Sequence, residues 1–105
     1  MSRRSANDPG VPGSRESALC QRAFRHRRKG DQRRALLAFR QAALENDEDP
    51  RLWTLYGVQC MRVGQADTAR QAIVHAAWLR DRRGERAKAQ VTRALLSRLD
   101  QETAA

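Results

Sequence analysis

Residues 30–43 read GDQRRALLAFRQAA, and residues 64–77 read GQADTARQAIVHAA. The second stretch echoes the first after an interval of 34 residues. Small residues permit close helix packing and a large apolar residue fills the space between helices, so this interval is typical of stacked helix–turn–helix units. The matching pairs are Gly30 and Gly64, Ala35 and Ala69, Phe39 and Ile73, Ala42 and Ala76, and Ala43 and Ala77.

Glycine, aspartate and proline divide the rest of the 105-residue chain into predicted helices. Gly30 and Gly64 suit the left-handed turn that ends a helix. Asp31 suits the cap of the next helix, and Asp49-Pro50 suits another helix start. Apolar residues recur between these signals at helical spacing, and no segment alternates as a strand does. We predict an all-α fold of five helices, over residues 18–29, 31–45 (capped by Asp31), 51–63, 66–80 and 85–100.

The predicted repeat resembles a known family at several positions. The residues that carry the likeness are Pro50, Trp53, Gly57, Gly64, Ala69, Ile73 and Ala76. These residues resemble the tetratricopeptide repeat, and residues 16–49 look like a second copy in which Leu19 replaces the family's large aromatic residue. The resemblance implies stacked antiparallel hairpins in a right-handed superhelix, with repeats 16–49 and 50–83 and a capping helix at 85–100. An unrelated helical bundle is the alternative.

The two ends of the chain lack this pattern. Residues 1–15 combine proline, glycine and few apolar residues, so we predict a flexible tail there and a short tail at 101–105. No run of apolar residues is long enough to span a membrane, and the N-terminus lacks the apolar stretch of a secretory signal. We therefore expect one domain, in the cytoplasm, with no membrane partner.

In the tetratricopeptide family the first helix of each hairpin lines the concave face of the stack. The resemblance therefore implies a groove with an apolar floor and a cationic rim. Such a groove suits an acidic or amphipathic protein segment, as in a small adaptor or chaperone. The alternative is that Phe24 and Val58 only pack between helices. The expected groove residues are Ser17, Cys20, Phe24, Arg27, Arg28, Arg51, Thr54, Val58, Met61, Arg62, Lys88, Thr92 and Leu95.

The formal net charge of +9 favours acidic partners. Every basic residue except Lys29 and Lys88 is arginine, a bias that a GC-rich coding sequence also produces. The densest run of cations lies between Arg22 and Arg34. This run is open to three interpretations: a solvated face, a protein contact, or a nucleic-acid contact that follows phosphates without reading sequence. A nucleic-acid-associated helical protein is thus the alternative function.

Nothing in the sequence predicts catalysis. His26 and His75 have no acidic or cysteine partner at a recognisable spacing, and no phosphate loop or metal-binding motif occurs. We therefore predict no enzyme activity, no metal and no cofactor. Cys20 and Cys60 are expected to be packed, reduced thiols, with a disulfide or redox role as the alternative.

Two further expectations concern packing. We predict that Trp78 packs under the last helix, the alternative being exposure to solvent. The last helix is expected to pack through a stripe made of Ala87, Val91, Ala94, Leu95 and Leu99. Two repeats are fewer than the three usually needed for a stable stack, so self-association or a bound partner is a further expectation.

Overall fold

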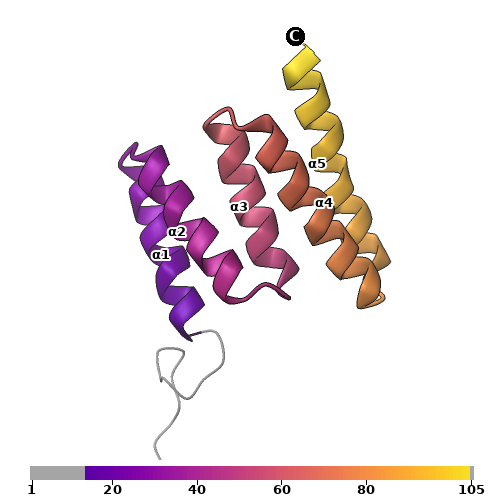
Figure 1. Ribbon diagram of the computed structural model, residues 1–105, viewed down its shortest axis with the longest axis horizontal. Helices are drawn as coiled ribbons and strands as arrows, with labels where there is room; N and C mark the ends of the chain where they lie inside the picture. The colour runs from indigo at the N-terminus through magenta and orange to yellow at the C-terminus, as the bar shows by residue number, and fades with distance from the viewer. Residues whose placement is uncertain (1–13, 105) are drawn as a thin grey trace, which may run out of the picture.

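The computed structural model describes residues 14–104 of the chain, with side chains described for residues 18–101. All regular structure in this range is helical, as predicted, and there are five helices (Figure 1). The predicted N-terminal tail lies outside the described residues except for Ser14 and Arg15, which begin the first helix. The predicted C-terminal tail is wrong for residues 101–104, which continue the last helix. The bounds are α1 Ser14–Arg28, α2 Gln32–Glu45, α3 Pro50–Arg62, α4 Ala66–Arg82 and α5 Arg86–Ala104.

Three of the turns between helices share one backbone design. Gly30, Gly64 and Gly84 adopt φ angles of 84°, 80° and 77°, the left-handed region that glycine enters without steric cost. In each turn the residue after glycine donates its N–H to a carbonyl five residues earlier, which satisfies the open end of the helix. These bonds are Asp31 N to His26 O at 2.8 Å, Gln65 N to Cys60 O at 2.9 Å, and Glu85 N to Arg80 O at 2.8 Å.

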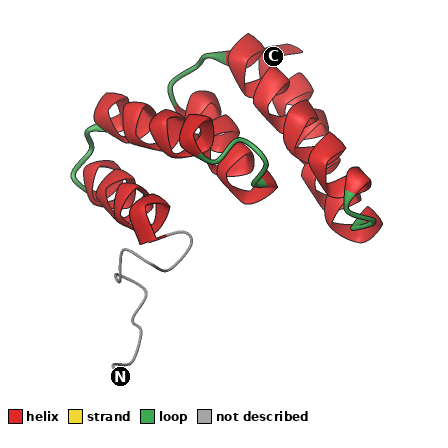
Figure 2. Ribbon diagram, turned by 60° about the horizontal axis from the view of Figure 1, so that its bottom comes forward, coloured by secondary structure: helices red, strands yellow, loops and turns green. Residues whose placement is uncertain are grey.

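Aspartates begin two of the helices, as the sequence predicted. The Asp31 carboxylate accepts the Arg34 N–H at 3.1 Å, and the Asp49 carboxylate accepts the Arg51 N–H at 2.9 Å. Pro50 occupies the first turn of α3, where its missing N–H costs nothing. The short loops that result keep successive helices adjacent (Figure 2).

Each helix packs against its neighbours in the sequence, in the serial order α1 to α5 (Figure 1). The repeated positions form the contacts between them. Phe39 and Ile73 are almost completely buried, and so are the alanines that accompany them. The small side chains thus let the helices approach, while the two large ones fill the remaining space.

Two packing predictions are wrong. Trp78 is 51% exposed. The buried faces of α4 are formed mostly by small residues, and position 78 lies outside those faces. The predicted stripe of α5 is wrong at Ala87, Val91 and Ala94, which are exposed, whereas Leu99 is buried as predicted and Leu95 is half-buried. The buried residues of α5 are Ala89, Thr92 and Leu99. The spacing of the apolar residues correctly predicts a helix, but it does not identify which side of α5 faces α4.

The remaining expectations concern thiols and membranes. Cys20 and Cys60 are both buried and no disulfide joins them, as predicted for packed thiols. Within residues 14–104, none of the helices combines the length and apolar character required to cross a bilayer.

Candidate functional site

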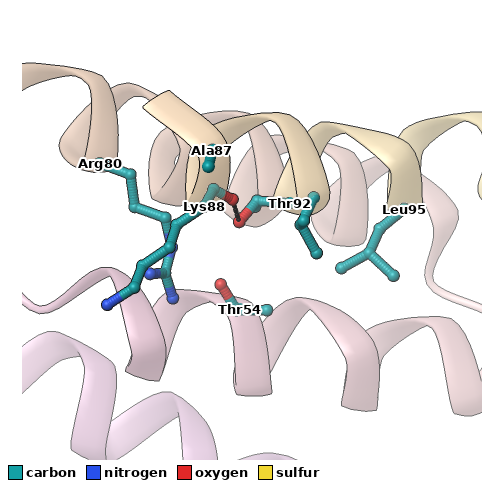
Figure 3. A pocket seen from close by; sticks show the side chains of 7 residues that line it. Thr54, Arg80, Ala87, Lys88, Thr92 and Leu95 are labelled. Atoms are coloured by element: carbon teal, nitrogen blue, oxygen red, sulfur yellow. Dashed lines mark hydrogen bonds between the residues drawn. The ribbon is translucent and has the colours of Figure 1, made fainter. Parts of the chain in front are cut away.

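A groove of about 350 Å³ lies between α3 and α5 (Figure 3). The turn at Gly84 folds α5 back along α4, which sets α5 across from α3. Lys88, Thr92 and Leu95 follow one another at helical spacing, so they share the side of α5 that faces the groove. The residues that line it are Thr54, Arg80, Ala87, Lys88, Val91, Thr92 and Leu95.

The floor of this α3/α5 groove is mostly apolar. Val91 is 72% exposed, the largest exposed fraction among the large hydrophobic side chains of the described residues. The hydroxyls of Thr54 and Thr92 donate to the Pro50 and Lys88 carbonyls of their own helices, each at 2.8 Å. Their hydrogens are therefore already used, and a bound segment would meet mainly hydrocarbon.

One end of the groove is cationic. The side chains of Arg80 and Lys88 reach over this end, and Leu95 lies towards the other (Figure 3). Glu85 faces both cations, with Arg80 Nη1 4.0 Å and Lys88 Nζ 3.8 Å from its carboxylate oxygens. One carboxylate between two cations leaves a net positive charge, which can attract a carboxylate of a partner.

Arg27 points inward rather than towards a rim. Its Nε donates to Gln59 Oε1 at 3.0 Å, and its guanidinium carbon lies 5.2 Å from the centres of both the Phe24 and Phe39 rings. Burial lowers the pKa of Arg27 below its ordinary value, and the positive charge of Arg62 lowers it further. Arg27 thus ties α1 to α2 and α3, a structural role that limits its availability to a partner.

Gln59 is the polar centre of this junction and is completely buried. Its Nε2 donates to the backbone oxygen of Gln32 at 2.9 Å and to the side-chain Oε1 of Gln32 at 3.0 Å. Arg62 Nε donates to the same Oε1 at 3.3 Å. Sequence reasoning missed Gln59, because a buried glutamine has no signature in a hydrophobic pattern.

The structure brings only some of the predicted groove residues together. Thr54, Lys88, Thr92 and Leu95 come together in the α3/α5 groove. Phe24 and Met61 are partly buried and pack against the core, and Val58 and Arg27 are half-buried. Three are exposed: Arg28, Arg51, which pairs with Asp49 at 3.7 Å, and Arg62. Cys20 is buried, and the Ser17 side chain lies outside the described residues.

The sequence assigned Ala87 and Val91 to the core and did not consider Arg80. All three line the groove. Val91 lies three residues after Lys88 and four before Leu95, so its place on the same face was visible in the spacing. Val91 was missed because the sequence analysis assigned it to the buried stripe of the last helix.

The basic run of α1 and α2 is divided by the fold. Arg22, Arg25, Arg28, Lys29 and Arg33 are exposed. Arg34 is also exposed, but it pairs with Asp31 at 3.4 Å, and Arg27 turns towards the core. Among the described residues no cluster of histidine, cysteine, aspartate or glutamate could hold a metal ion.

In comparisons with protein-family models, curated proteins and solved structures, no match to this chain was found. Its geometry and chemistry therefore carry the functional argument.

Proposed function

We propose that this chain is a tetratricopeptide-like adaptor or chaperone, without catalytic activity, that holds an acidic or amphipathic segment of another protein. The α3/α5 groove is the binding site in this proposal. The observation that carries it is an exposed apolar floor, centred on Val91, that ends at the two cations Arg80 and Lys88.

The repeated architecture supports this proposal. The turns that follow α1 and α3 have the same glycine conformation and the same hydrogen bond, displaced by the interval of the sequence repeat. Hairpins that repeat in this way stack into a right-handed superhelix in the tetratricopeptide family, whose grooves hold peptide segments. α5 would then be the helix that covers the last repeat.

The chemistry of the groove indicates the kind of segment. Burial of apolar side chains against Ala87, Val91 and Leu95 would favour binding, because it removes apolar surface from water. A carboxylate placed near Arg80 and Lys88 would set the orientation. The net charge of +9 would raise the rate of encounter with an acidic partner.

The test is photocrosslinking in cells with benzoylphenylalanine in place of Val91, followed by identification of the captured segment. A synthetic copy of that segment is then titrated against the purified chain. We expect Val91→Glu to weaken binding at least about tenfold, because it places a carboxylate on the apolar floor. Ala94→Glu is the matched control, because Ala94 is exposed on the same helix and does not line the groove.

Two results would contradict the proposal. One is a captured segment that is neither acidic nor amphipathic. The other is equal binding of that segment by Val91→Glu and by the wild-type chain.

The exposed cations of α1 and α2 support a second candidate function, binding to nucleic acid. Phosphate contacts release counterions, so this binding would fall steeply as salt increases. Two titrations at low and moderate salt distinguish the candidates, one with single-stranded and duplex DNA and one with the synthetic copy of the captured segment. Groove binding would persist in moderate salt and would depend on Val91, whereas phosphate binding would depend on Arg22 and Arg25.

A further inference from the structure

Large apolar side chains are exposed on α2 and α4, the two helices that flank a second groove. Leu37 and Leu44 are each 52% exposed, Val74 is 50% exposed and Trp78 is 51% exposed. The groove between α2 and α4 has a volume of about 270 Å³. Among the residues that line it are Arg40, Leu44, Trp53, Tyr56, Ala72 and His75.

Aromatic rings form one side of this α2/α4 groove. The Trp53 and His75 rings meet edge to face with their centres 5.0 Å apart, and His75 stacks on Trp78 at 5.8 Å. The indole N–H of Trp53 donates to the Asp47 carbonyl at 2.9 Å, which fixes that ring. A row of rings held in this way loses little conformational entropy when it binds a partner.

Helical spacing explains why the sequence places these groups together. On α4 the positions of His75, Trp78 and Arg82 fall on one stripe, and Arg82 lies 4.8 Å from the centre of the Trp78 ring. On α2 the positions of Arg40 and Leu44 share a stripe that faces the same groove. Trp78 therefore extends the aromatic row beyond the residues that line the groove, towards the C-terminal end of α4.

The charges around the groove indicate its occupant. Arg40 lines the groove and Arg82 lies over the Trp78 ring, and no ion pair joins either of them to an acidic side chain of the described residues. Glu45, on the same helix as Arg40, accepts a hydrogen bond from Gln41 at 3.0 Å. A second copy of the chain carries the same net charge of +9 and would be repelled. An acidic partner would instead be complementary.

The aliphatic residues distinguish a protein partner from a nucleic acid. Bases stack on flat rings, and Arg82 and His75 already contact the Trp78 ring. Leu44 at the groove edge is suited to contact an apolar side chain rather than a base. We propose that the α2/α4 groove binds an acidic segment of a second protein, which inserts a large apolar side chain between Leu44 and the aromatic row.

This inference is independent of the proposed function, because the α2/α4 groove shares no lining residue with the α3/α5 groove. The two grooves can therefore be occupied at the same time. The chain would then link two protein segments, one on each groove.

The test is selection of random peptides displayed on phage against the immobilised full-length chain, with removal of the peptides that also bind the Leu44→Glu variant. We expect the survivors to be acidic and to share one large apolar residue. Leu44→Glu and Trp78→Glu should each weaken a selected synthetic peptide at least about tenfold. Tryptophan fluorescence reports binding, since Trp53 and Trp78 border the site.

Val74→Glu is the control, because Val74 is 50% exposed on α4, lies off the stripe of His75, Trp78 and Arg82, and does not line the groove. It should change affinity by less than about twofold, and Val91→Glu should leave affinity unchanged. Circular dichroism checks that each variant is folded, and Leu44→Gln replaces Leu44→Glu if the charge lowers helicity.

Four outcomes would overturn the inference. They are survivors without net negative charge, equal losses for Val74→Glu and Leu44→Glu, a dimer in sedimentation that Leu44→Glu abolishes, and tight binding of oligothymidine that Trp78→Glu abolishes. The third would identify a second copy of the chain as the occupant, and the fourth would identify a nucleic acid.

Discussion

Gly57 determines how closely α3 approaches α4. A Cβ atom at this position would lie 2.6 Å from Ile73 Cδ1 and 3.3 Å from the Ala72 Cβ. Glycine inside a helix costs about 1 kcal/mol relative to alanine, so its presence indicates a compensating contact. The structure identifies Ile73 as the residue that occupies the space.

We predict that Gly57→Ala lowers the free energy of unfolding by about 1–2 kcal/mol, because the overlap with buried Ile73 outweighs the gain in helix propensity. Urea unfolding followed by circular dichroism measures the change. In an Ile73→Ala background the same substitution should no longer destabilise, since the clashing atoms are gone. A Gly57→Ala chain as stable as the wild type would disprove the tight contact.

Cys60 and Tyr56 should make stability depend on alkaline pH. Burial raises the pKa of both groups, and contact with Cys60 raises that of Tyr56 further. A raised pKa means that the folded state favours the protonated form, so the contribution to stability is complete below the unfolded pKa. That contribution is lost as pH rises through the folded pKa.

We therefore expect a smaller free energy of unfolding at about pH 10.5 than at about pH 7.5, with the loss beginning near the ordinary thiol value of 9.0. Urea titrations at the two pH values measure it. The pH dependence should be weaker in a Cys60→Ala, Tyr56→Phe double variant, and identical pH dependence in that variant would contradict this assignment.

At the scale of the elements, turn chemistry was predictable but helix rotation was not. Glycine in the left-handed conformation and aspartate caps act over a few residues, so the sequence located the turns at Gly30 and Gly64. The last helix has small or apolar residues on more than one side. Its buried face therefore depends on α4, which no local pattern describes.

The rotation of α5 can be tested with two alanines. Ala89 is completely buried and Ala94 is exposed, whereas the sequence placed Ala94 in the core. We expect Ala89→Glu to lower the free energy of unfolding by about 3 kcal/mol or more, because it buries an unpaired charge. Ala94→Glu should change it by less than about 0.5 kcal/mol. If Ala94→Glu destabilised the chain more than Ala89→Glu in thermal and urea unfolding, the face of α5 predicted from the sequence would be the buried one.

For the whole molecule, the dominant electrostatic feature is an excess of positive charge. Several ion pairs join the described residues, such as those between Arg93 and Asp81 and between Arg70 and Asp100, but they lie at the surface. Exposed pairs contribute little, and a net charge of +9 makes the folded chain repel itself.

We predict that raising NaCl from about 10 mM to about 300 mM increases the melting temperature, because salt screens this repulsion. Thermal unfolding followed by circular dichroism measures the shift, with the same neutral-pH buffer at both salt concentrations. A lower melting temperature at the higher salt concentration would show that ion pairs outweigh repulsion.

The candidate site was predictable in part. The family resemblance assigned Thr54, Lys88, Thr92 and Leu95 to one surface, and these four residues line one groove. Arg27 was assigned to a rim but turns inward, because Gln59 and two phenylalanine rings offer it contacts from three helices. Spacing along one helix carries no information about such contacts.

The sequence by itself determined the number of helices, their approximate ends, the small residues at their contacts and the sign of the charge. These properties depend on interactions between residues close in the chain or on composition alone. Only the tertiary structure decided that Trp78 and Val91 are exposed, that Gln59 is buried and that two separate grooves form. A side chain's burial depends on which neighbouring helix covers it, and the rotation of each helix is set by packing across the whole stack.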